Sequence, residues 1–136
     1  MDDLGISSKV ASSGMKAQAT RLRIISENLA NADSTSEIPG REPYRRKLIT
    51  FREALDKSID ADTVKVKKIF NDQSPLKSKY DPTHPGANDE GYIQIPNVNP
   101  LVELMDMREA QRAYEANLNV ISTSRSMVAK TLELLK

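Results

Sequence analysis

Apolar residues recur at helical spacing in the first part of the chain, between about positions 4 and 32, where there is no proline. One row, with members seven residues apart, consists of Met15, Leu22 and Leu29. A neighbouring row consists of Leu4, Ala11, Ile25 and Ala32, with Gln18 interrupting it. Two adjacent rows form a narrow seam, which is typical of a coiled coil and not of a broad core-facing stripe. We therefore predict an N-terminal helix that packs through this seam.

The same pattern returns after position 100 and is strongest there. A strict seven-residue row consists of Met107, Tyr114, Ile121, Val128 and Leu135. A companion row consists of Leu104, Leu118 and Leu132, with Gln111 and Arg125 as polar members. This pattern predicts a long coiled-coil-like helix, which at about 1.5 Å per residue is roughly 50 Å in length.

The middle of the chain has a different character. All seven prolines lie between positions 39 and 100, as do three of the five glycines. Short β-type runs occupy 44–51, 63–70 and 92–95. Phe51, Leu55 and Ile59, four apart, indicate a short helical turn, and the polar, proline-containing stretch 73–91 indicates an extended loop.

These patterns divide the chain into three zones. An N-terminal rod helix spans 1–35, a β-rich and loop region spans 36–100, and a C-terminal rod helix spans 101–136. The predicted fold class is mainly α with a β-rich insertion, in which the terminal helices together form one coiled-coil-like domain. The seams fit two arrangements equally well: an assembly with neighbouring chains, or a monomeric helical hairpin that carries a β insertion.

Composition narrows the function classes. Hydrophobic residues make up 38% and aromatic residues 4% of the 136 residues, so we expect a lean core that is completed by partners. The net charge of +1 gives no bulk attraction to nucleic acid or to an anionic membrane. Without cysteine there are no disulfides and no thiolate sites. We find neither a membrane-spanning apolar run nor a cleavable signal at the acidic N-terminus, and expect no direct membrane insertion.

The sequence offers little chemistry for catalysis. His84, the only histidine, lies in a proline-containing turn with Asp81 and Asp89 nearby, which we interpret as a surface loop and not as a metal site. No Ser/His/Asp set or phosphate-binding glycine loop is recognisable. We therefore predict no catalytic, cofactor or metal site, no small-molecule substrate and no enzyme activity.

Charged and amide side chains have structural interpretations. A basic cluster at 41 and 45–47 is diluted by nearby glutamates, so we favour ion pairs with neighbouring subunits, or plain solvation, over nucleic-acid binding. Asn28 and Asn31 are expected to end the first helix and to bond loop or neighbour backbone. Asn97 and Asn99 are expected to do the same where the last helix begins, with Pro100 fixing its start.

Several of these residues belong to motifs that resemble a known family. The segment SGMKAQATRLRIISENLANADST contains Asn28-Leu29-Ala30-Asn31, and the later segment HPGANDEGYIQIPNVNPLVELMDMREAQRAYEANLNVI contains Gly91-Tyr92, Pro96-Asn97-Val98-Asn99 and Tyr114-Glu115-Ala116-Asn117. Together they strongly resemble the proximal-rod proteins of the bacterial flagellar basal body, most closely the FlgC type. The first motif alone is shared with other rod, hook and hook-associated subunits. The likeness covers most of the chain, weakens at 52–62, and includes an insertion at 36–43 longer than in the simplest members.

The resemblance implies a structural subunit that is exported uncleaved through the flagellar type III apparatus. It implies self-assembly with other rod proteins, inside the periplasm, into a helical drive shaft that joins the membrane ring and export gate to the distal rod. This shaft transmits torque and conducts exported subunits. The candidate subunit-assembly residues are Met15, Leu22, Ile25, Asn28, Leu29, Asn31, Met107, Tyr114, Asn117, Leu118, Ile121, Val128, Leu132 and Leu135. A soluble coiled-coil adaptor or chaperone-like binding module is the alternative at this stage.

Overall fold

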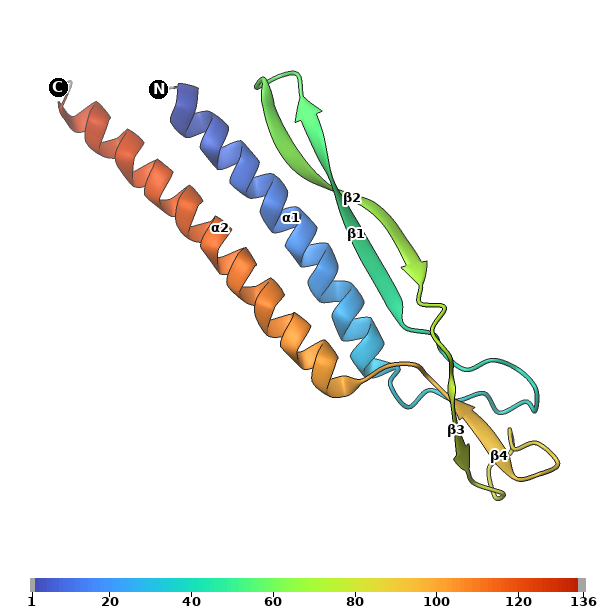
Figure 1. The fold of residues 1–136 in the computed structure, drawn as a ribbon. Helices are drawn as coiled ribbons and strands as arrows, with labels where there is room; N and C mark the ends of the chain where they lie inside the picture. Colours follow the sequence, from blue (N-terminus) through green and yellow to red (C-terminus); the bar gives the residue numbers. More distant parts are fainter. Residues whose placement is uncertain (1, 135–136) are drawn as a thin grey trace. The chain divides into compact units, whose positions relative to one another are not determined.

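The computed structural model describes residues 2–134, in which one long helix precedes the β-rich middle of the chain and another follows it (Figure 1). In chain order, the elements are α1 Asp2–Ala30, β1 Lys47–Asp56, β2 Ala61–Asn71, β3 Lys77–Tyr80, β4 Tyr92–Ile95 and α2 Pro100–Leu134. The predicted fold class, mainly α with a β-rich insertion, is confirmed.

The strands form two separate two-stranded sheets, β1 with β2 and β3 with β4. β3 and β4 are antiparallel, with Lys77 opposite Ile95 and Tyr80 opposite Tyr92. The predicted helical turn around Phe51 and Leu55 is wrong, because β1 continues to Asp56. Residues four apart share one face of a strand as well as neighbouring positions on a helix, so that spacing did not discriminate between the two. The predicted loop at 73–91 was also too simple, since it contains β3.

Asparagine side chains mark the helix ends. At the start of α2, the Leu101 N–H donates to Asn99 Oδ1 at 3.0 Å, and Pro100 is the first helical residue, where its missing N–H costs nothing. At the end of α1, Asn31 Nδ2 donates to the Glu27 carbonyl at 2.8 Å, and Ser34 Oγ donates to Asn31 Oδ1 at 3.0 Å. The predicted end-of-helix roles of Asn31 and Asn99 are therefore confirmed.

The chain divides into two compact units. Within the described residues, the first unit consists of 2–22, 49–68 and 108–134, and the second of 23–48 and 69–107. In the first unit, α1 and α2 lie side by side in opposite directions, as the Arg21–Glu109 ion pair at 3.4 Å and the approach of Gly14 to Asn117 show. On another side of α1 lies the β1–β2 hairpin, tied to it by a hydrogen bond of 3.1 Å from the Val64 N–H to Ser13 Oγ.

The two units bury different kinds of residue. The second unit buries the large apolar residues Ile24, Ile25 and Ile93 together with the polar Asn28 and Glu103. In the described part of the first unit, the buried side chains are all small, namely Ala11, Ala17, Thr63, Ala110 and Ser124. Burial of apolar surface stabilises by about 25 cal/mol per Å², so the fully buried residues of the first unit, being small, contribute less than the three isoleucines of the second.

Candidate assembly surfaces and the polar network

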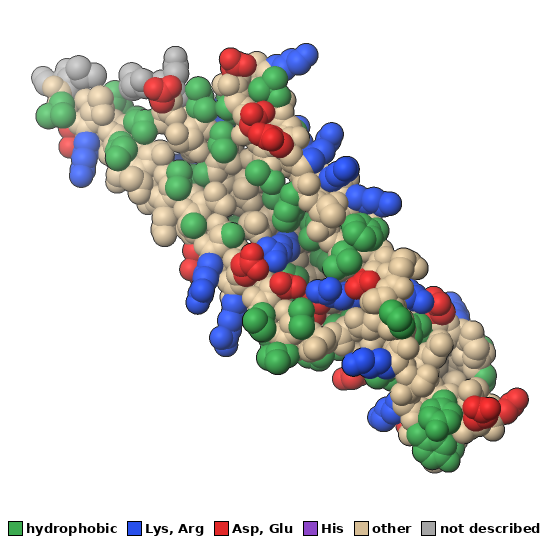
Figure 2. Space-filling view, in the orientation of Figure 1, with side chains coloured by type: hydrophobic (Ala, Val, Ile, Leu, Met, Phe, Trp, Pro, Cys, Tyr) green, Lys and Arg blue, Asp and Glu red, His purple; other side chains and the backbone are tan. Residues whose placement is uncertain are grey.

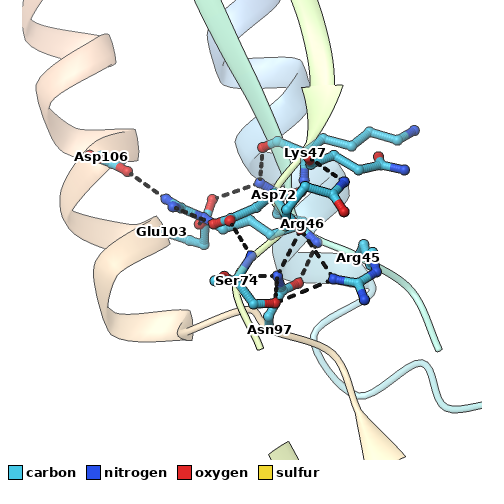
Figure 3. A network of polar contacts seen from close by, with 11 residues as sticks. Arg45, Arg46, Lys47, Asp72, Ser74, Asn97, Glu103 and Asp106 are labelled. Carbon is cyan, nitrogen blue, oxygen red and sulfur yellow. Dashed lines mark hydrogen bonds and ion pairs between the residues drawn. The ribbon is translucent and has the colours of Figure 1, made fainter. Parts of the chain in front are cut away.

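Figure 3 shows a network of polar contacts in the second unit, with Arg46 and Glu103 among its labelled residues. Asn28, which is only 1% exposed, makes four of the hydrogen bonds of this network. Its Nδ2 donates to the Lys47 carbonyl at 2.9 Å and to Glu103 Oε2 at 3.1 Å. Its Oδ1 accepts from the Lys47 N–H at 2.8 Å and from the Tyr44 hydroxyl at 2.9 Å. An amide has two donors and one oxygen with two acceptor positions, so this side chain is fully satisfied. Asn28 thereby pairs the end of α1 with the start of β1 and with α2.

Arg46 and Glu103 form the charged centre of the network. Glu103 is 0% exposed and accepts from Arg46 Nε at 2.5 Å. The Arg46 guanidinium also donates to Asp106 Oδ2 at 3.3 Å and lies 3.9 Å from Asp72 Oδ2. A buried carboxylate is tolerated only when it is paired and hydrogen-bonded, and Arg46 with Asn28 supplies both oxygens of Glu103 with a partner.

Asn97 fastens the segment after β2 to the same network. Its Oδ1 accepts from the Arg46 N–H at 2.8 Å, and its Nδ2 donates to the Asp72 carbonyl at 3.1 Å and to Ser74 Oγ at 3.0 Å. Arg45 contributes a further bond to the Asp72 carbonyl at 3.3 Å. Asn97 thus bonds loop backbone, as predicted, while Asn99 alone caps α2.

The network perturbs two ionisable groups. Burial, followed by the nearby carboxylates of Glu27 and Glu103, raises the pKa of Tyr44 to about 12. The backbone N–H of Ser74 holds the pKa of Asp72 below its usual value, with smaller contributions from Arg46 and Arg45. Neither of these two groups is poised to exchange a proton near neutral pH.

The structure places the N-terminal candidate residues on the packed side of α1. Ile25 and Asn28 are buried, while Met15, Leu22, Leu29 and Asn31 are half-buried. In α2, the row Met107, Tyr114, Ile121 and Val128 is half-buried. The companion row is different, because Leu104, Leu118 and Leu132 are 46%, 47% and 49% exposed. Leu135 lies outside the described residues.

Asn117 occupies the inner face of α2 in the first unit. A Cβ built on Gly14 would lie 3.0 Å from Asn117 Nδ2, so Gly14 permits this close approach of α1 and α2. The buried residues Ala110 and Ser124 stand seven positions to either side of Asn117. The inner face of α2 therefore consists of small and polar residues as well as the predicted Tyr114 row, and the exposed Leu118 row is not part of it.

Sequence reasoning missed the roles of Glu103 and Arg46. The basic cluster was expected to pair with neighbours or water, whereas Arg45 pairs with Glu42 at 2.9 Å, Arg46 with Glu103, and Lys47 with Glu27, all within one chain. The available signal was Glu103 in the first turn of a predicted helix, since it follows Pro100 closely. Its partner, 57 positions away in sequence, has no periodic signal.

His84 has a local bonding role. Its Nε2 lies 3.0 Å from Thr35 Oγ1, and its Nδ1 accepts from the Gly86 N–H at 3.0 Å. In the described part of the chain, no group of three or more His, Asp or Glu side chains is arranged to hold a metal ion. Among the same residues, no helix has both the length and the apolar character needed to cross a bilayer.

Two family models match the chain at the regions that contain these features. One, described as the flagella basal body rod protein, matches residues 9–36. The other, described as the flagellar basal body rod FlgEFG protein C-terminal region, matches residues 89–134. The helices and the turn motifs thus define a flagellar axial protein of the rod class.

Curated relatives match over 92–100% of the chain. The flagellar basal-body rod protein FlgC of Agrobacterium fabrum is 52% identical over 136 residues, which is 100% of this chain and 98% of the relative. FlgC of Borreliella burgdorferi is 43% identical, over 93% of this chain and 94% of the relative. FlgC of Salmonella typhimurium is 38% identical, over 92% of each chain. The chain belongs to the FlgC family of flagellar basal-body rod proteins and is a structural rod subunit.

Proposed function

We propose that this rod subunit assembles, with copies of itself and with other rod proteins, into the periplasmic drive shaft of the flagellum. In this role it contacts the membrane ring and export gate, transmits torque and surrounds the path of exported subunits. It reaches the periplasm through the flagellar type III apparatus. The exposed apolar residues of α2 are the observation that carries the proposal.

These residues lie on two flanks of α2 in the first unit. The Leu118 flank consists of Leu118 and Leu132, and the Met127 flank consists of Val120, Met127 and Leu134, all of them between 45% and 87% exposed. At 3.6 residues per turn, Leu118 and Met127 point in opposite directions, about 180° apart, with the inner Asn117 face between them. Figure 2 shows apolar side chains at the surface along the helices. A helix with apolar residues on both flanks suits neighbours on both sides, as in an open helical assembly.

The interior of the first unit supports the same proposal. Its buried side chains are Ala, Ser and Thr, so larger apolar residues that would normally build a core remain available at the surface. Gln18 Oε1 is buried without a hydrogen-bond partner among the described residues. Buried polar groups in native structures are generally satisfied, and a donor from an adjacent subunit would satisfy this one.

The candidate assembly residues divide between two roles on this proposal. Leu118, Leu132 and Met127 contact neighbouring chains, while the Tyr114–Ile121–Val128 row and Asn117 hold α2 against α1. In α1, the half-buried residues Met15, Leu22 and Leu29 contribute both to contacts with neighbouring chains and to the contact with α2. Ile25, Asn28 and Asn31 position α1. Catalysis has no place in this role, because the polar network holds its charged groups in ion pairs and hydrogen bonds.

Localisation in purified basal bodies tests the proposal. A small tag inserted in the exposed turn between β1 and β2 leaves both helices intact, and labelled particles should carry the tag along the rod. A strain lacking the chain should form membrane rings without rods, and expression of the chain should restore rods. Normal rods and motility in the deletion strain would contradict the proposal. So would localisation of the tagged, complementing chain in the cytoplasm alone.

A further inference from the structure

A groove of about 560 Å³ separates α1 from the β1–β2 hairpin in the first unit. Ala17, Val64 and Val66 contribute apolar surface to it, and Ser12 and Thr20 contribute hydroxyl groups. The hydrogen bond from the Val64 N–H to Ser13 Oγ, 3.1 Å long, holds the two walls at a fixed spacing. The volume is within the usual range of a ligand or peptide pocket.

The groove has an excess of positive charge. Lys9, Lys16 and Lys65 line it, against a single acid, Asp56. Asp56 accepts from Ser58 Oγ at 2.7 Å and from the Ser58 N–H at 3.0 Å, and these bonds together with nearby Lys65 and Lys9 lower its pKa, so its charge offsets only part of the positive charge of the groove. No described acidic side chain forms an ion pair with any of the three lysines within 4 Å. This lysine groove therefore suits an acidic segment.

The second unit presents such a segment at the turn before β4. Asn88 Oδ1 accepts from the Glu90 N–H at 3.1 Å and from the Tyr92 N–H at 2.8 Å, while Gly91 adopts a φ of 81°. The turn is thus held by hydrogen bonds within itself, from backbone N–H groups to the Asn88 side chain and from the Gly91 N–H to the Asn88 carbonyl. Asp89 and Glu90 at its tip are exposed, and neither is in an ion pair with a described side chain. Two adjacent carboxylates on a rigid turn lose little conformational entropy on binding.

We propose that the lysine groove of one copy receives the acidic turn, residues 88–91, of a second copy in the rod. This inference rests on the proposed function and adds a specific contact to it. The groove and the turn are different surfaces, so the contact is heterologous and leaves a free groove and a free turn for further copies. The apolar flanks of α2 contribute affinity in the same assembly, and the charge pairs fix register and exclude wrong partners.

Charge reversal on each side tests the contact. The doubly substituted chains Lys16→Glu/Lys65→Glu and Asp89→Lys/Glu90→Lys are each expected to lower the yield of complete rods, because like charges then face each other. The chain carrying all four substitutions is expected to regain rods, since the pairs are restored with opposite sign. Lys77→Glu/Lys79→Glu, a matched change on the exposed strand β3, is the control and should leave rods near the unmodified yield.

Wild-type yields from either doubly substituted chain, or no recovery in the fourfold variant, would overturn the docking. Circular dichroism of each purified chain establishes that the helices are intact. If a reversed chain fails to fold, the neutral pair Lys16→Gln/Lys65→Gln replaces it and should produce a smaller loss, with an unchanged yield counting against the contact. Absence of the unmodified chain from basal bodies would defeat the proposed function itself. If the unmodified chain forms normal rods but the fourfold variant does not regain them, only the proposed contact is defeated.

Discussion

The two units of this chain differ in the side chains that they bury. The second unit closes its interior with Ile24, Ile25 and Ile93 and satisfies Asn28 and Glu103 within the chain. The first unit buries only small side chains among its described residues and leaves Leu118, Met127 and Leu132 about half exposed. The second unit therefore closes an apolar and polar interior within the chain, whereas the first has little fully buried apolar interior. Both units expose large apolar residues, such as Met105 in the second and Met127 in the first.

This difference separates the network, which fixes local conformation, from the apolar flanks of α2 that we propose as assembly surfaces. A buried ion pair contributes little net stability but strongly penalises any arrangement that separates its members. The network accordingly fixes how α1, β1 and α2 meet. Exposed apolar flanks behave differently, because they stabilise the protein only when a neighbouring molecule covers them and removes them from water.

The largest expected effect is at Glu103. Glu103→Ala leaves Arg46 and Asn28 without their shared partner, and loss of one member of a buried pair typically costs about 3–5 kcal/mol. Glu109→Ala removes an ion pair whose carboxylate is 70% exposed, so the loss there should stay within about 1 kcal/mol. Chemical denaturation of both variants measures the difference. Equal losses would show that the network is no more important than a surface ion pair.

The second expected effect separates folding from assembly in α2. Leu118→Asp, on an exposed flank, should change the stability of the isolated chain by no more than about 0.5 kcal/mol, yet prevent rods from forming. Ile121→Asp, on the half-buried row, should abolish rods and also destabilise the isolated chain, because a carboxylate enters its own helix contact. Denaturation curves together with electron microscopy of basal bodies distinguish the two variants. Complete rods built from the Leu118→Asp chain would refute the role of this flank.

A smaller effect concerns the close approach of the two helices. Gly5→Ala meets no atom within 4 Å and should stabilise α1 by about 0.5–1 kcal/mol, the usual helical advantage of alanine. Gly14→Ala places a methyl group 3.0 Å from Asn117 Nδ2 and should lose that advantage or reverse it. Thermal unfolding of the two variants provides the comparison. An equal gain at both positions would mean that α1 and α2 are not held closely at Gly14.

The smallest effect is the ionisation of Tyr44. The folded-state pKa of Tyr44, about 12, exceeds the ordinary value of 10.0. The protonated phenol therefore contributes to the stability of the folded chain fully below pH 10, and this contribution is lost as the pH rises toward 12. Ultraviolet titration of the folded chain should reveal one late-ionising tyrosine, which disappears in Tyr44→Phe. If that substitution leaves the late phase unchanged, the phenol does not occupy the network described here.

Periodic features of the fold were predictable, and long-range polar features were not. The heptad rows identified both helices, and the predicted start of the last helix at position 101 lies one residue from the observed start of α2 at Pro100. The β-type runs predicted at 63–70 and 92–95 also located β2 and β4 closely. Phe51 and Leu55 were assigned to the wrong element, because a spacing of four is compatible with both a strand and a helix. Arg46 and Glu103 carry no periodicity, and their pairing becomes visible only when the fold brings them together.

The assembly residues illustrate the same limit. The spacing grouped Tyr114, Ile121 and Val128 into one row, but it could not tell an inner row from an outer one. Leu118 and Leu132 have the same spacing and yet lie on an exposed flank. The inner positions next to them, Ala110, Asn117 and Ser124, are small or polar, so hydrophobicity alone could not mark them as the face that contacts α1.

The central claim is that neighbouring subunits cover the exposed apolar flanks of α2 in the rod. Protection of a cysteine at the Leu118 flank from thiol reagents tests this claim most directly. The chain has no natural cysteine, so Leu118→Cys introduces a single thiol, and Glu115→Cys on the polar outer face of the same helix provides the control. Thiol reagents should modify both variants readily in the isolated chain. In purified basal bodies, modification at position 118 should fall well below that at position 115, because a neighbouring subunit covers the flank. Undiminished modification of position 118 in complete rods would contradict the account.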